Sequence, residues 1–151
     1  MARWLGLDHG AKRIGLAVGE TTTGIATPLE VISAEPFNEV IRRVLDLAEQ
    51  YGAGGIVVGW PLNMDDTEGN QARLARRMAR DIAHRTHLAV RIWDERLSSF
   101  AADKALAGYL TRKQKKARQD AVAAASMLAD FLACDGPTKA PSPEESPEPS
   151  E

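Results

Sequence analysis

Disulfide bonds, a secretion leader and a membrane span all lack support in this sequence of 151 residues. Its one cysteine, Cys134, has no partner with which to close a disulfide inside the chain. No charged and then apolar leader opens the chain, so we expect a cytoplasmic protein. The longest apolar stretches, such as residues 54–60, fall well short of the roughly 18 residues that cross a bilayer, and we expect no membrane role.

An excess of one charge is also missing from the chain as a whole. It has 19 basic and 21 acidic residues, for a net charge of −2. From Pro137 onward one lysine stands against four glutamates, so the rest of the chain has 18 basic and 17 acidic residues. This end is rich in proline, serine and glutamate, and it carries too little apolar surface to offset the entropy of ordering. We therefore predict one domain at residues 1–135 and a disordered acidic tail at residues 136–151.

Hydrophobic spacing predicts a sheet whose first strands are antiparallel and whose later strands are parallel. The segments WLGLD and RIGLAVG should form a hairpin with its tip at residues 9–12, and a third strand should run over residues 25–32. The runs GGIVVG and LAVRIW predict two more strands. Helices are predicted from Phe37 to Ala48 and, roughly, over residues 70–84, 99–109 and 120–133. This order predicts an α/β fold, a mixed five-stranded sheet with helices on both faces.

Acidic residues stand where two of these strands end. Asp8 ends the first strand, and Asp94 and Glu95 end the last one. In open α/β sheets, sites form outside the carboxyl ends of the parallel strands, so these acids should share a site. Side chains alternate along a strand, and Asp94 and Glu95 should therefore point to opposite faces. Only one of the two is then a primary ligand, and the spacing alone does not choose between them.

A third acid, Asp120, heads the buried stripe of the last predicted helix. It shares a helix face with Ala124, Met127 and Phe131. An unpaired charge on that face would be costly, so Asp120 either caps the helix or meets a cation, and both interpretations stay open. Carboxylates without cysteine or histidine neighbours favour hard cations, which predicts Mg²⁺ or Mn²⁺, with two ions acting on a phosphodiester.

Basic residues beside these acids predict contacts with nucleic acid. Five of them lie within seven residues directly before Asp120, in a segment that we expect to be a loop. Such a segment would bind the phosphate backbone without reading bases. Lys12, Arg13 and Arg96 flank the acids, and Asn63 lies in the loop after the central strand. The predicted nucleic-acid-binding residues are Lys12, Arg13, Asn63, Arg96, Arg112, Lys113, Lys115, Lys116 and Arg118.

Four segments together resemble the YqgF, or RuvX, family, whose members are described as Holliday-junction-resolvase-like and as nucleases of ribosomal RNA precursors. They are LGLDHGAKRIGLAV, GWPLNMDDTEGNQA, DERLSS and DAVAAASML, and the resemblance covers nearly all of residues 3–133. It implies an RNase H-like sheet. It also implies that Asp8, Glu95 and Asp120 are the catalytic, metal-binding acids, with Asp94 a secondary neighbour. The sequence departs from the family at His9, where smaller or apolar residues are usual, and at Asp66, where glycine is frequent.

The resulting prediction is a metal-dependent phosphodiesterase that acts on structured nucleic acid. Processing of pre-16S ribosomal RNA is its favoured role. Holliday junction resolution and a non-catalytic nucleic-acid-binding subunit are the alternatives. The first segment also resembles the phosphate loops of actin and sugar-kinase ATPases, which suggests an ATPase-like nucleotide binder. This alternative ranks third, because that architecture normally needs two such domains and this chain has only one. A homodimer would suit a substrate with two-fold symmetry.

Overall fold

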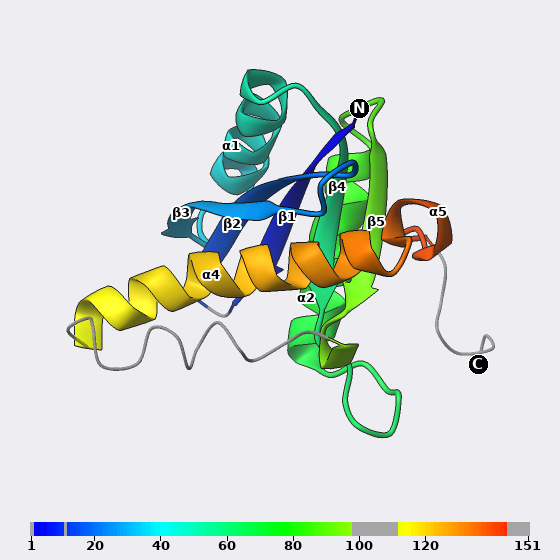
Figure 1. Cartoon of the computed structure of the whole chain (residues 1–151). Helices are drawn as coiled ribbons and strands as arrows, with labels where there is room; N and C mark the ends of the chain where they lie inside the picture. The colour runs from blue at the N-terminus through cyan, green and yellow to red at the C-terminus, as the bar shows by residue number, and fades with distance from the viewer. Residues whose placement is uncertain (1, 11, 98–111, 145–151) are drawn as a thin grey trace.

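The computed structural model describes residues 2–10, 12–97 and 112–144 (Figure 1), and for residues 112–119 it describes the backbone alone. The helix predicted at residues 99–109 lies outside these ranges. No helix in the described part of the chain is long and apolar enough to cross a membrane.

Five strands form one mixed sheet, as the sequence predicts. Their order across the sheet is β3-β2-β1-β4-β5. The β1–β2 and β2–β3 pairs are antiparallel, and the β1–β4 and β4–β5 pairs are parallel. The central position of β1 brings its carboxyl end next to those of β4 and β5. The strands are β1 (Arg3–His9), β2 (Arg13–Glu20), β3 (Ala26–Ser33), β4 (Ala53–Trp60) and β5 (Ala89–Asp94).

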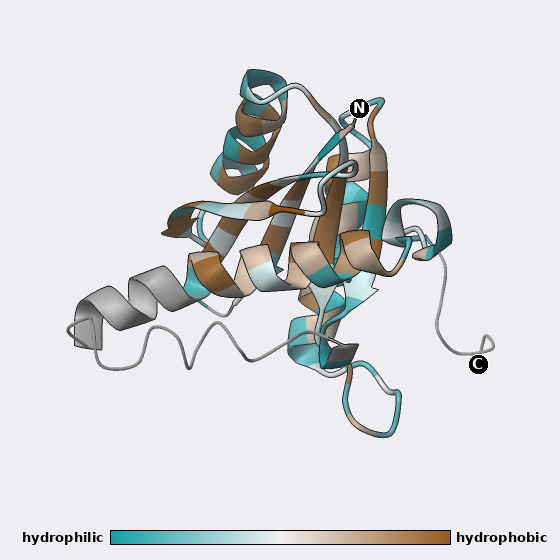
Figure 2. Ribbon diagram, viewed as in Figure 1, coloured by the Kyte–Doolittle hydropathy of each residue, from teal (hydrophilic) through white to brown (hydrophobic). Residues whose placement is uncertain are grey.

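Helices cover both faces of the sheet (Figure 1). Helices α1 (Phe37–Gln50) and α2 (Asn70–Ala83) pack on one face, and α4 (Arg112–Ala133) crosses the other. The apolar stripes of these helices face inward and their polar residues face out (Figure 2), as expected for amphipathic helices on a sheet. Each face of the sheet therefore has its own core cluster.

Helix α4 starts earlier than predicted. The basic stretch from Arg112 to Arg118 was expected to be a loop, but its backbone forms the first turns of α4. Arginine, lysine, glutamine and alanine are all good helix formers, and the segment contains no glycine or proline to stop the helix. The prediction of a helix that begins at Asp120 is therefore wrong by two turns.

Residues 136–144, the start of the segment predicted as a disordered tail, have a described conformation and contact the domain. A short helix, α5 (Gly136–Lys139), follows α4, and Ala140 is buried against the α4-side core. The backbone N–H of Ile92 in β5 then donates to the carbonyl of Pro141 at 2.9 Å. Because β5 is an edge strand, the N–H of Ile92 has no partner strand and can bind this segment. The composition of the segment alone does not reveal such a partner.

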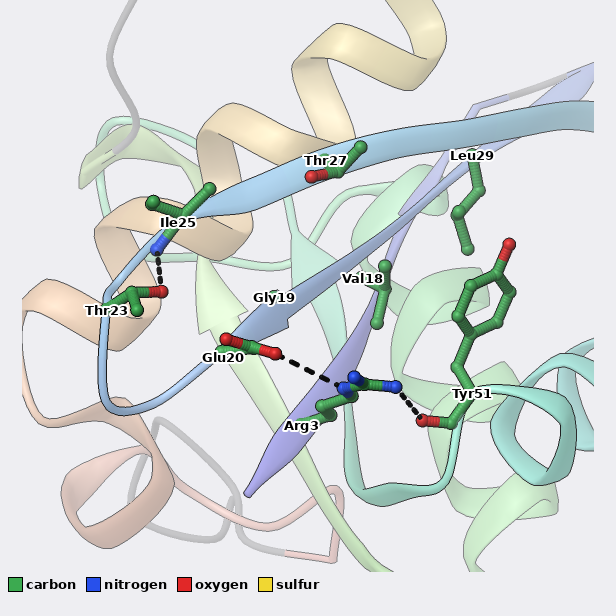
Figure 3. A pocket seen from close by; sticks show the side chains of 9 residues that line it. All are labelled: Arg3, Val18, Gly19, Glu20, Thr23, Ile25, Thr27, Leu29 and Tyr51. Carbon is green, nitrogen blue, oxygen red and sulfur yellow. Dashed lines mark hydrogen bonds and ion pairs between the residues drawn. The ribbon is translucent and has the colours of Figure 1, made fainter. Parts of the chain in front are cut away.

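A pocket of about 480 Å³ opens at the start of β1, at the opposite end of that strand from Asp8 (Figure 3). Val18, Leu29 and the ring of Tyr51 give it apolar walls. Arg3 crosses it and donates to the Tyr51 carbonyl at 3.0 Å and to Glu20 at 3.4 Å. The acids of the predicted site take no part in this pocket.

Candidate active site

Two of the predicted acids meet at the carboxyl edge of the sheet. Asp8 is near the end of β1, and Glu95 begins the short 3₁₀ helix η1 (Glu95–Leu97) that follows β5 directly. Burial first, and then a hydrogen bond with and repulsion from the Asp8 side chain, raise the pKa of Glu95 to about 9. The protonated form of Glu95 is therefore favoured at neutral pH.

Glycine at position 59 makes room for the Glu95 side chain. A Cβ atom on Gly59 of β4 would collide with the Glu95 carboxylate. Gly59 pairs with Trp93, so it lies beside the end of β5 on the face that α4 covers. Glu95 thus points to the α4 face, and the close approach depends on the absence of a side chain on β4.

Asp120 lies inside α4 and is not an N-cap, which closes one of the two interpretations that the sequence left open. Its backbone rests on Gly15, where a Cβ atom would collide with the Asp120 carbonyl. Gly15 is the cross-strand partner of Asp8. The main chain of Asp120 is therefore held over the strand pair that carries Asp8, and α4 also contacts η1.

The carboxylate of Asp120 is paired with a cationic side chain. Its Oδ2 atom lies 3.0 Å from Nε of Arg13, in an ion pair that lacks hydrogen-bond geometry. In the described part of the chain, no group of three or more histidine, cysteine, aspartate or glutamate side chains is arranged to hold a metal ion. The structure thus brings Asp8 and Glu95 together, and places Asp120 over the same strands with its charge directed at Arg13.

Two buried carboxylate oxygens lack hydrogen bonds, namely Glu95 Oε2 and Asp120 Oδ2. Buried polar atoms normally have hydrogen-bond partners, but Glu95 Oε2 has none and Asp120 Oδ2 has only its ion pair with Arg13. A hard divalent cation takes oxygen ligands of this kind, and on Glu95 it would replace the proton. The donor set therefore fits Mg²⁺ or Mn²⁺.

Asp94 faces away from this pair and binds Arg96. Nε and Nη2 of Arg96 donate to the two carboxylate oxygens of Asp94 at 3.0 and 2.7 Å. Nη1 donates to the Asn63 carbonyl at 3.0 Å and lies 2.9 Å from Oδ1 of Asp66. These partners raise the pKa of Arg96 further. Arg96 was predicted to contact nucleic acid, but its guanidinium binds Asp94 and the loop after β4. Asp94 was predicted as a secondary metal ligand, but its carboxylate binds Arg96.

The other predicted nucleic-acid contacts fall into three groups. Lys12 is exposed at the hairpin tip. Asn63 uses its side-chain amide within its own loop, where Nδ2 donates to Oγ1 of Thr67 at 3.0 Å. The five basic side chains of residues 112–118 lie outside the described side chains, so only their place in the first turns of α4 is known.

The family model described as "RuvX: Holliday junction resolvase" matches residues 2–134 of this chain. The chain belongs to the RuvX family. A relative from Ruegeria pomeroyi, named "Putative pre-16S rRNA nuclease", is 44% identical over 128 residues, which cover 84% of this chain and 83% of that protein. A relative of the same name from Rhodobacter capsulatus is 42% identical over 128 residues, with 84% and 80% covered.

Solved structures place this RuvX chain in the RNase H-like fold, as the resemblance implies. RuvC of T. thermophilus in complex with a Holliday junction substrate has a TM-score of 0.56 at 18% identity, and the match covers 93% of this chain and 99% of that one. The Holliday junction resolvase of fowlpox virus has a TM-score of 0.54 at 11% identity, with 87% and 99% covered. At these identities, the likeness concerns the fold alone.

Both departures from the family pattern have a structural account in this RuvX chain. Asp66, where glycine is frequent, has a φ of 71°, which is the left-handed conformation that glycine favours. Its ion pair with Arg96 offsets this cost. His9 is buried, and Nε2 of Gln71 contacts its Nδ1 at 2.8 Å and donates to its carbonyl at 3.0 Å. Burial lowers the pKa of His9.

Sequence reasoning missed the residues that make room for the acids and hold their neighbours. Gly15 and Gly59 carry no chemistry of their own, and Gln71 lies in a helix from which no site residue was predicted. A signal for Gly15 was present, because a hairpin with its tip at residues 9–12 pairs Asp8 with Gly15. No comparable local pattern points to Gly59 or Gln71, since their partners are distant in sequence.

Proposed function

We propose that this chain is a divalent-metal-dependent nuclease that hydrolyses phosphodiester bonds of structured nucleic acid, with pre-16S ribosomal RNA as its substrate. The observation that carries this proposal is the half-buried pair of Asp8 and Glu95 at the sheet edge, with one Glu95 oxygen buried and Asp120 fixed over the same strands. Half-buried carboxyl groups that repel each other are a costly arrangement unless a cation is to be bound between them.

Asp8, Glu95 and Asp120 would hold Mg²⁺ or Mn²⁺, and we propose two ions. Such ions supply a nucleophilic water at neutral pH and stabilise the leaving oxygen of a phosphodiester. The chain's own part is to fix the ligands. Gly59 lets Glu95 reach the α4 face, and Gly15 lets the Asp120 backbone lie over the strand pair that carries Asp8.

The ribosomal substrate rests on the names of relatives that are about 40% identical over most of both chains. The basic first turns of α4, which run directly into Asp120, suit a phosphate backbone in a folded RNA. A second candidate, resolution of Holliday junctions, is favoured by the description of the matching family model. Phosphate contacts dominate both interfaces, so the substrates differ in shape more than in chemistry.

A cleavage panel tests both the site and the substrate. Purified protein is incubated with a pre-16S RNA fragment and with a four-way DNA junction, in Mg²⁺, in Mn²⁺ and in EDTA. We expect metal-dependent cleavage of the RNA that Asp8→Asn abolishes, because one carboxylate of the half-buried pair is lost. The matched control is Asp46→Asn on the outer face of α1, where the same charge is removed from an exposed position.

Circular dichroism checks that both variants are folded. Cleavage that survives in a folded Asp8→Asn protein would refute the proposed site. Cleavage of the junction alone would transfer the proposal to the second substrate. Binding of both nucleic acids without cleavage in any cation would leave a non-catalytic binding protein.

A further inference from the structure

Two arginines flank the candidate site, and their partners differ. The guanidinium of Arg96 is engaged with Asp94, with the Asn63 carbonyl and with Asp66. Arg13, in the described part of the chain, has a single polar partner, which is Asp120. The side chains of Arg13 and Asp120 are 38% and 33% exposed, so water screens their pair and makes it easy to break.

Asp120 cannot withdraw from Arg13 by moving its backbone. The main chain of α4 at this residue is in close contact with Gly15, two residues beyond Arg13 on the same face of β2. The Oδ2 atom that faces Arg13 is itself buried and makes no hydrogen bond. A divalent cation that binds this oxygen therefore competes with the guanidinium for it.

A displaced Arg13 remains at the edge of the site. It begins β2, directly after the exposed Lys12 of the hairpin tip. A guanidinium presents parallel N–H donors that match the oxygens of a phosphate, and it stays charged at any physiological pH. Once freed from Asp120, Arg13 is the arginine beside the acids whose donors are available to a nucleic-acid backbone.

From these contacts we propose that Arg13 is a cation-released phosphate clamp. In the cation-free protein it closes on Asp120, and binding of a divalent cation to Asp120 frees it to hold a substrate phosphate. The proposal rests on the proposed metal-dependent function and adds a coupling to it. Cation and nucleic acid then strengthen each other's binding by the same factor, as linkage requires.

Binding measurements without catalysis test this clamp. Uptake of Mn²⁺ is followed through the electron paramagnetic resonance signal of the free ion, for wild type, Arg13→Gln, Arg13→Lys and Arg42→Gln. Arg42 is 70% exposed on α1, on the opposite face of the sheet, so its loss is the matched change in net charge. We expect Arg13→Gln to bind Mn²⁺ about twofold to fivefold more tightly, which is the range for a lost exposed ion pair. Arg13→Lys should stay near wild type, and Arg42→Gln should equal it.

The second readout is affinity for a short double-stranded RNA, measured by fluorescence anisotropy in EDTA and in Ca²⁺, with a gel to show that the RNA stays intact. In EDTA, wild type and Arg13→Gln should bind equally, because Arg13 is closed on Asp120. In Ca²⁺, wild type should bind about fivefold more tightly than Arg13→Gln, as for one phosphate contact.

The possible outcomes distinguish failure of the Arg13 clamp from failure of the proposed metal-dependent function. Equal losses of RNA affinity for Arg13→Gln in EDTA and in Ca²⁺ would show that Arg13 is always free, and would overturn the clamp alone. Unchanged or weaker Mn²⁺ uptake by Arg13→Gln would do the same. If wild type and Arg13→Gln both take up no Mn²⁺, the metal-dependent function fails and the clamp fails with it.

Discussion

The two faces of the sheet are built from different residues. Beneath α1 and α2 the strands present large branched side chains that are fully or almost fully buried. Beneath α4 many of them are small, with Trp4, Val57 and Trp93 as the large exceptions, and the helix backbone comes close enough to touch β2. The first set includes Leu5, Leu7, Ile14, Leu16, Ile56, Val58 and Ile92, and the second includes Gly6, Gly15, Ala17, Gly19, Gly55 and Gly59.

The unsatisfied polar groups follow the same division. The buried side-chain atoms without hydrogen bonds in the described residues are Nε1 of Trp93, Oε2 of Glu95 and Oδ2 of Asp120, and all belong to the α4 face. The α1–α2 face has the larger set of fully buried aliphatic side chains and contributes strongly to stability. On the α4 face, Gly15 and Gly59 admit the Asp120 backbone and the Glu95 carboxylate, so the candidate site lies on one side of the sheet.

The largest effect should come from filling the space at Gly15. Gly15→Val puts a branched side chain where the Asp120 carbonyl lies, and a backbone atom of a helix cannot rotate away. We expect the free energy of unfolding to fall by about 3 kcal/mol and cleavage to be lost, because α4 shifts together with Asp120. Urea unfolding and the RNA cleavage assay measure the two effects.

The control for Gly15→Val is a substitution at Ile14, the preceding residue of β2, whose side chain points to the opposite face of the sheet. Ile14 is fully buried beneath α1 and α2, and Ile14→Ala should cost a similar 3 kcal/mol, roughly, through the cavity that it leaves. At temperatures where the variant is folded, cleavage should persist. Loss of cleavage in both variants would show that the two faces are not functionally distinct.

A smaller and more selective effect is expected at Gly59. Gly59→Ala would place a methyl group against the Glu95 carboxylate, which is the end of a side chain and can shift. We expect the free energy of unfolding to change by about 1 kcal/mol at most, while cleavage slows by about 100-fold because a ligand is displaced. Gly54→Ala on the same strand is the matched control, since a Cβ atom there has only the Arg3 carbonyl nearby, at 3.9 Å. Equal rates for both alanine variants would count against Glu95 as a ligand.

The smallest expected effect concerns pH and stability in metal-free buffer. Glu95 loses its proton near its ordinary pKa of 4.5 in the unfolded chain, but only at about 9 in the folded protein. The unfolded state binds fewer protons between these values, so the free energy of unfolding falls as pH rises through this window. Glu95→Gln does not titrate. It should therefore raise the melting temperature by about 3 to 6 °C at pH 8, and by much less at pH 5.

Thermal melts of wild type and Glu95→Gln in EDTA at both pH values measure this difference. Asp46→Asn, on the exposed side of α1, should show no such trend. A gain of equal size at pH 5 and pH 8 would mean that burial does not hold the proton on Glu95.

Local pattern was sufficient to predict the sheet and the edge at which Asp8 meets the acids that follow the last strand. Strand alternation predicted that Asp94 and Glu95 point to opposite faces, and the choice of Glu95 as the partner of Asp8 came from the resemblance to the family. The contacts that surround them come from distant segments. The Arg13–Asp120 pair depends on where α4 crosses β2, and the start of α4 depends on helix propensity beyond its apolar stripe.

The segment after α4 teaches the same lesson for composition. Proline, serine and glutamate predicted disorder, yet Ala140 finds a place in the core and Pro141 offers its carbonyl to β5. Neither contact requires an apolar run in the segment itself. Residues 136–144 are held by a surface that the rest of the chain supplies. The sequence of the segment alone therefore cannot predict these contacts.

The backbone hydrogen bond between Ile92 and Pro141 also bears on whether two copies of this protein can associate through the edges of their sheets. It occupies one outer edge of the sheet, and the opposite edge carries Pro28 beside a shift in register between β2 and β3. Proline and irregular pairing are common means of preventing strand addition by a second chain. Both edges of the sheet therefore carry a feature that disfavours strand addition by a second copy, and removal of residues 136–144 would free the backbone N–H of Ile92 on β5.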